Sequence, residues 1–146
     1  MPSFTTNFTS MSKYPTVPTE LPNVFGDFQT ALVALETAKI GIYKFRPVKP
    51  SNKLSEHTAT AMRKLADELE AYESERAEFD YWATTARDYN AAIDQKIEDT
   101  VKRDAGFYKI PELYRDKVWR KAWADGHSGG WSEVFGQLCE LVDIFQ

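Results

Sequence analysis

Residues 51–105 form the longest stretch of this 146-residue chain without glycine or proline, and this gap constrains the fold more than any other feature. Nothing in it would end a helix, and Ser55 near its start is a suitable N-cap. Apolar residues recur there at alternating spacings of three and four, which is typical of a coiled-coil seam. We therefore predict one long amphipathic helix over residues 55–104.

The seam of this helix predicts self-association. Fifty residues of helix are roughly 75 Å long, whereas a compact domain of this size is about 40 Å across. Either the helix bends, for example at Thr84–Thr85, or a second copy covers the seam, and we favour the second copy. The predicted oligomer interface consists of Met62, Leu65, Leu69, Tyr72, Arg76, Phe79, Asn90, Ile93 and Ile97. Asn90 would fix the register of such an interface.

The flanking segments complete a mainly α fold. A short helix is predicted over residues 27–39 with Asp27 as its N-cap, followed by a β-prone segment, 40–45, that is at most one edge strand. Two helices at 111–125 and 132–145 are expected to form a C-terminal helical hairpin around the glycines of GHSGG.

Residues 1–22, rich in Ser, Thr and Pro, predict an extended or disordered arm. The arm is either an unanchored tail or, through its aromatic residues such as Tyr14, docked on the body or on a partner. Residues 23–146 are expected to form a single helical domain.

The composition of the chain argues against several functional classes. The net charge of the chain is −4, whereas proteins that bind nucleic acids carry clusters of positive charge that neutralise phosphates. We therefore expect no direct nucleic-acid contact. The single cysteine favours a reducing compartment and excludes a multi-cysteine zinc site, and no stretch is apolar enough to span a membrane. We expect a cytoplasmic protein without cofactor or metal.

The segment GHSGG at residues 126–130 satisfies the GxSxG pattern of hydrolase nucleophile elbows, with Ser128 as the nucleophile. That motif requires a preceding strand and a triad histidine downstream, whereas the preceding residues indicate a helix and His127 is the last histidine. A helix–helix turn is the favoured interpretation, a small hydrolase is the weakest alternative, and no catalytic residue is assigned.

Two features instead predict binding to a protein. Residues 67–80 hold seven acidic side chains against Arg76 alone, which suits either a solvated helix face or contact with a basic, nucleic-acid-binding partner. The C-terminal hairpin adds aromatic anchors. The predicted partner-binding residues are Asp67, Glu70, Glu73, Glu78, Asp80, Trp119, Trp123 and Trp131.

The segment AWADGHSGGWSEV, within roughly the last 35 residues, resembles a segment of small accessory proteins of tailed bacteriophages. The resemblance implies a phage product that acts in a bacterial host, and it carries no assigned chemistry. The leading hypothesis is a non-enzymatic accessory protein that binds and inhibits a host macromolecule, such as a defence protein. The alternative is an oligomeric coiled-coil component of a virion or another assembly.

Overall fold

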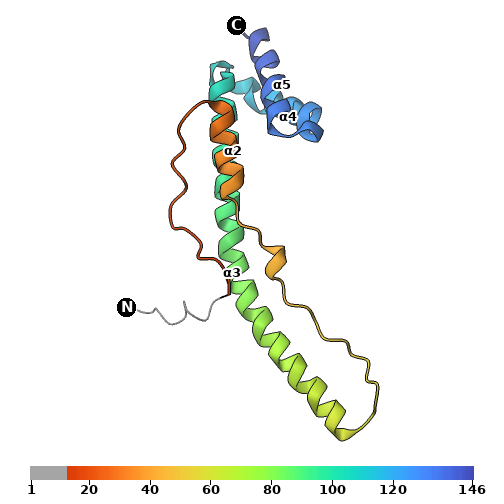
Figure 1. The fold of residues 1–146 in the computed structure, drawn as a ribbon. Helices are drawn as coiled ribbons and strands as arrows, with labels where there is room; N and C mark the ends of the chain where they lie inside the picture. The colour runs from red at the N-terminus through yellow and green to blue at the C-terminus, as the bar shows by residue number, and fades with distance from the viewer. Residues whose placement is uncertain (1–12) are drawn as a thin grey trace. The chain divides into compact units, whose positions relative to one another are not determined.

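The computed structural model describes residues 13–146, and within them the chain is built of helices and contains no strand (Figure 1). The four α-helices in this part of the chain are α2 (Phe28–Ala38), α3 (Ala59–Ala105), α4 (Glu112–Gly126) and α5 (Trp131–Ile144). Single 3-10 turns lie at Tyr43–Phe45, Phe107–Lys109 and His127–Gly129. The predicted mainly α class, with a long central helix and a C-terminal helical hairpin, is confirmed.

The long helix begins four residues later than predicted. Thr58 is its cap, because the Thr58 hydroxyl accepts a hydrogen bond of 3.1 Å from the Ala61 amide. Helical structure continues through Thr84, whose hydroxyl donates to the Asp80 carbonyl at 2.8 Å. α3 ends at Ala105, and Gly106 follows in the left-handed region at φ 82°, which is typical of the residue after a helix C-terminus.

Three other local predictions can be compared with the structure. Asp27 is confirmed as the N-cap of α2, since its carboxylate accepts from the Thr30 amide at 2.8 Å. This hydrogen bond is the main reason why the pKa of Asp27 lies below its usual value. The edge strand over residues 40–45 is wrong, because Tyr43–Phe45 is a 3-10 turn and Ile42 is buried. The last helix begins at Trp131 after Gly130, one residue earlier than predicted.

The chain divides into two compact units that share α3 between them. Unit 1 comprises the described part of Met1–Glu20 together with Ile40–Asn90, and unit 2 comprises Leu21–Lys39 and Ala91–Gln146. The single-domain prediction over residues 23–146 did not anticipate this division. It follows from the length of α3, because each half of the helix buries its apolar residues among different segments.

Unit 1 has an aromatic core around the middle of α3. Its buried members are Ile42, Phe79, Trp82, Ala83 and Ala86, with Tyr14, Val17, Ile40 and Phe45 packed around them. The Tyr14 and Trp82 rings stack with centroids 5.0 Å apart, and the Trp82 indole N–H donates to the Pro15 carbonyl at 2.8 Å. Residues 13–20 are therefore anchored on the unit and do not form a detached tail; residues 1–12 of the predicted arm lie outside the described residues.

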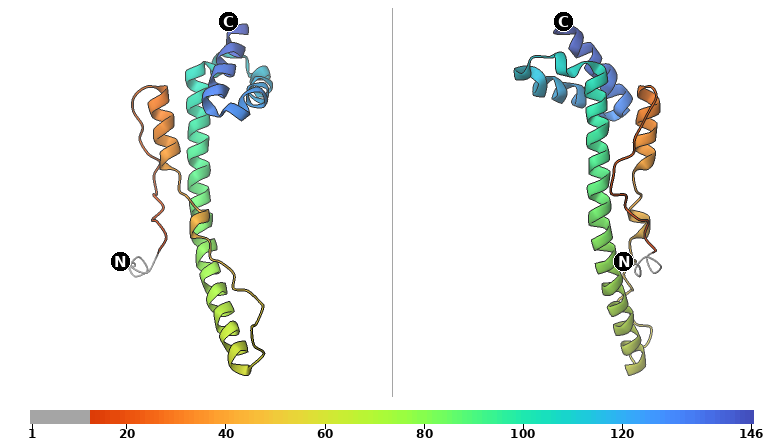
Figure 2. Two further views of the ribbon diagram at one scale, coloured as in Figure 1. Left: turned by 45° about the vertical axis from the view of Figure 1, so that its right-hand side comes forward. Right: turned by 90° about the vertical axis from the view of Figure 1, so that its left-hand side faces the viewer.

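Unit 2 gathers α2, the last third of α3 from Ala91 onward, and the C-terminal hairpin of α4 and α5 (Figure 2). Phe28 of α2 and Phe135 of α5 stack with ring centroids 4.0 Å apart. The buried apolar residues of the helices are Ala31, Leu32, Leu35, Ile93, Ile97, Val101, Ala105, Val118, Ala122, Val134, Leu138 and Val142. The candidate site lies in this unit, on α3 and the C-terminal hairpin.

Candidate functional site

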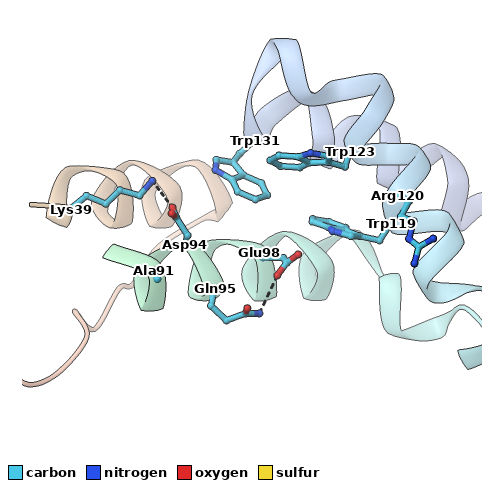
Figure 3. Close-up of a pocket in the computed structure, with 9 residues that line it drawn as sticks. All are labelled: Lys39, Ala91, Asp94, Gln95, Glu98, Trp119, Arg120, Trp123 and Trp131. Atoms are coloured by element: carbon cyan, nitrogen blue, oxygen red, sulfur yellow. Dashed lines mark hydrogen bonds and ion pairs between the residues drawn. The ribbon is translucent and has the colours of Figure 1, made fainter. Parts of the chain in front are cut away.

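Three tryptophans line a surface groove of about 640 Å³ in unit 2 (Figure 3). Trp119 and Trp123 come from α4, and Trp131 is the first residue of α5. The other lining residues are Lys39, Ala91, Asp94, Gln95, Glu98 and Arg120. We call this feature the tryptophan groove. It combines an aromatic wall from the hairpin with a polar wall from α3.

The local fold explains why these three rings meet. Trp119 and Trp123 are four residues apart, so they lie on the same face of α4. The turn after α4 is tight, since a Cβ on Gly126 would stand 2.9 Å from the Val134 amide nitrogen, and Gly130 has φ 82°. This reversal places Trp131 with its centroid 5.3 Å from Trp123 and 6.3 Å from Trp119. Trp123 remains 46% exposed.

A lysine from α3 already occupies one aromatic surface of this cluster. The Lys102 ammonium lies 4.4 Å from the Trp119 ring centroid and 4.9 Å from that of Phe107. It also forms an ion pair of 3.6 Å with Glu98. Such positions over ring faces are typical of cation–π attraction. The cluster thus has the electronic character needed to hold a cation.

The polar wall consists of carboxylates that are already paired. Asp94 forms an ion pair with Lys39, which also contacts Glu36 at 3.3 Å. Burial lowers the pKa of Lys39, but the hydrogen bond and charge of Asp94, with the charge of Glu36, outweigh it and raise that pKa overall. Gln95 donates to Glu98 at 3.1 Å, which orients this carboxylate beside the rings (Figure 3). Both carboxylates of the wall are therefore already engaged by side chains of the same unit.

The predicted oligomer seam is divided between covered and partly exposed positions. Phe79, Ile93 and Ile97 are buried in the chain's own packing. Asn90 does not face a second copy, because its side-chain amide exchanges two hydrogen bonds with the backbone of Ile40, at 2.8 and 2.9 Å. These four residues therefore offer no surface to a second copy in this structure.

The earlier part of the seam is more accessible. Met62 is 50% exposed, Leu65, Leu69 and Tyr72 are partly buried, and Arg76 is exposed. Arg76 contacts Asp80 at 3.0 Å and the Tyr72 hydroxyl at 3.1 Å along its own helix. An interface at residues 62–76 stays a prediction.

The predicted acidic contact surface belongs to unit 1, whereas the tryptophan groove belongs to unit 2. All of its predicted residues are exposed: Asp67, Glu70, Glu73, Glu78 and Asp80. Lys13 pairs with the neighbouring Glu75 at 3.3 Å, and Arg76 pairs with Asp80, so the chain itself neutralises part of this charge. Whether the stretch contacts a basic partner stays a prediction.

The GHSGG segment forms a helix–helix turn. Its residues His127–Gly129 make a 3-10 turn directly after α4, and the His127 Nδ1 atom lies 2.9 Å from the Ala124 carbonyl. A nucleophile elbow needs a strand before the serine, and a helix stands there instead.

Within residues 13–146, no group of three or more His, Cys, Asp or Glu side chains is placed to hold a metal ion. No helix in this part of the chain is long and apolar enough to cross a membrane.

Sequence reasoning identified the three tryptophans but missed the polar side of the groove. Asp94, Glu98 and Lys102 repeat at intervals of four on α3, which places them on one face of that helix. This spacing was the available signal. It could not show that the same face lies beside the hairpin, because that proximity arises only from tertiary packing.

The model of a family of unknown function, DUF8546, matches residues 38–146, so the chain belongs to this family. The matched range includes α3, the C-terminal hairpin and every residue that lines the tryptophan groove. No curated protein and no solved structure matches the chain.

Proposed function

We propose that this member of the DUF8546 family acts without catalysis, by binding a partner protein through its tryptophan groove. The observation that carries the proposal is the cluster of Trp119, Trp123 and Trp131, with Trp123 46% exposed. Tryptophan is enriched among residues that dominate binding energy at protein interfaces. An indole that is half exposed costs hydrophobic free energy in water, which burial against a partner would recover.

The nature of the partner rests on the phage-like C-terminal segment. A phage accessory protein would act in the bacterial cytoplasm, so the proposed partner is a host protein and the proposed outcome is inhibition of that protein, such as a defence factor.

The test compares capture of host proteins by three forms of the chain. Trp123→Ala removes the most exposed indole of the groove, and Leu113→Ala removes a 91% exposed side chain from the same helix as a matched control. We expect the specific partner to be recovered equally by the wild type and Leu113→Ala, and at least about tenfold less by Trp123→Ala, in line with a hot-spot contact. Quantitative mass spectrometry of captured proteins measures this. Identical recovery by all three forms would refute the proposal.

A second candidate function is a structural role as a homo-oligomer joined along the first half of α3. The observation that favours it is the partly exposed row of Met62, Leu65 and Leu69 on unit 1, which follows heptad spacing. Light scattering would give the molar mass of the wild type and of a Leu65→Lys/Leu69→Lys variant. A multimeric wild type that the variant converts to monomer supports this role, whereas a monomeric wild type eliminates it. A double variant at exposed acidic positions, Asp67→Lys/Glu70→Lys, controls for the added charge.

A further inference from the structure

The residues that line the tryptophan groove hold two cations and two carboxylates, and the side chains bonded to these lining residues add one cation and three carboxylates. Together they hold three cations and five carboxylates, a net charge of −2. These groups are Lys39, Lys102 and Arg120, with Glu36, Asp94, Glu98, Asp99 and Asp116. The surplus of carboxylates would attract a cation into the groove.

The two cations that line the groove are both engaged by neighbouring carboxylates. Lys39 pairs with Asp94, and Arg120 pairs with Asp116 at 2.6 Å. An anionic ligand would have to break these pairs and would meet the remaining negative charge. The groove therefore disfavours phosphates and acidic peptides.

The aromatic wall favours a cation that can also lie flat on a ring. Lys102 is engaged on the Trp119 and Phe107 rings, while Trp123 and Trp131 line the open groove. A guanidinium is planar, is weakly hydrated and stacks on aromatic faces, whereas an ammonium is compact and strongly hydrated. Arginine also matches the geometry of a carboxylate through paired N–H donors.

We propose that the tryptophan groove binds an arginine side chain from a basic polypeptide segment, with the guanidinium stacked on Trp123 and its N–H groups donating to Asp94. This inference rests on the proposed partner-binding function and names the chemistry of the partner. Asp94 is suited to the role because its side chain is 50% exposed and engages Lys39 through one oxygen, Oδ1. The arginine would share or displace the lysine at this carboxylate.

The test uses three short peptides that differ only in one side-chain type. They are acetyl-Gly-Arg-Gly-Arg-Gly-amide, the same peptide with lysine, and the same peptide with citrulline, which keeps the planar shape of arginine without its charge. Indole N–H signals of the wild-type protein are followed by NMR at physiological salt. Trp82 serves as the internal reference, because its N–H is bonded to Pro15 within the core of unit 1.

We expect the arginine peptide to shift the Trp123 and Trp131 signals in a saturable manner while the Trp82 signal stays in place. The citrulline peptide should bind at least about tenfold more weakly, and the lysine peptide should bind more weakly than arginine, because it lacks the planar stacking and the paired donors. Asp94→Asn should weaken arginine binding severalfold. Asp88→Asn, at an exposed acid of α3 outside both the groove and the acidic stretch of residues 67–80, should leave it unchanged.

Three results would overturn the assignment to arginine. They are the absence of shifts with the arginine peptide, equal binding of the citrulline peptide, and shifts confined to the amides of residues 67–80. If the peptide fails while capture of a host protein still depends on Trp123, the arginine assignment alone is wrong. If capture does not depend on Trp123, the proposed function is wrong, whatever the peptides do.

Discussion

At the scale of single residues, Asn90 shows how one polar side chain can be misread from its position in a repeat. It stands at a seam position of the heptad pattern, where asparagine commonly fixes the register between two chains. In the structure its side-chain amide satisfies both the N–H and the C=O of Ile40, fifty residues earlier. Asn90 therefore links the segment at Ile40 to α3. Its two hydrogen bonds satisfy backbone groups of Ile40 that would otherwise lack partners.

We predict that Asn90→Leu destabilises the protein by about 1–3 kcal/mol, because two backbone groups of Ile40 lose their partners. Urea unfolding followed by circular dichroism measures the change. Asn52→Leu, at an exposed position, is the matched control and should change stability by less than about 0.5 kcal/mol. A loss of oligomer mass without a loss of stability would instead place Asn90 in an interface between copies.

At the scale of elements, the α4–α5 hairpin depends on a close approach of two backbones. Gly126 is buried, and a Cβ there would lie 2.9 Å and 3.0 Å from the Val134 nitrogen and Cα. Neither contact can be relieved by rotation of a side chain, because both atoms belong to the backbone of α5. The hairpin in turn sets the distance between Trp131 and the two tryptophans of α4.

Gly126→Ala is therefore expected to destabilise the protein by about 1–3 kcal/mol through forced separation of the two helices. Gly136 provides a matched control within α5, since a Cβ there meets nothing within 4 Å. Gly136→Ala should be neutral or stabilising by up to about 1 kcal/mol, because alanine favours the helix. Thermal unfolding compares the two variants. Equal effects would show that the approach at Gly126 does not limit the packing.

At the scale of the whole molecule, one helix supplies residues to two separate compact units. Phe79, Trp82 and Ala86 are buried in unit 1, whereas Ile93 and Ile97 are buried in unit 2. The apolar seam, which is continuous in the sequence, therefore packs against different segments in the two units. Because different segments cover each half, the two units are expected to open with different free energies.

Hydrogen exchange tests this independence. Phe79→Leu should lower local stability by roughly 1 kcal/mol or somewhat more through loss of aromatic packing, and it should speed exchange mainly in residues 40–90. Leu138→Ala should act mainly on the amides of unit 2. If either variant speeds exchange to the same extent along the entire chain, the two units unfold as one.

Much of the architecture follows from local chemistry and was predictable. The stretch without glycine or proline gives α3, Asp27 caps α2, and Gly106 ends α3 in a backbone conformation that glycine adopts without steric cost. The errors arose where local signals compete: Thr58 and Ser55 are equivalent as caps, and the β-prone segment at 40–45 has no partner strand among the described residues.

The sequence by itself determined the helices, the apolar seam and the tryptophans as anchors, since spacing and capping act over a few residues. Only the tertiary structure decided what covers the seam and what faces the tryptophans. Ile40 reaches Asn90, and Lys102 reaches Trp119, through packing between segments far apart in the chain. Periodicity reports which face of a helix is apolar, but it contains no information on which segment will cover that face.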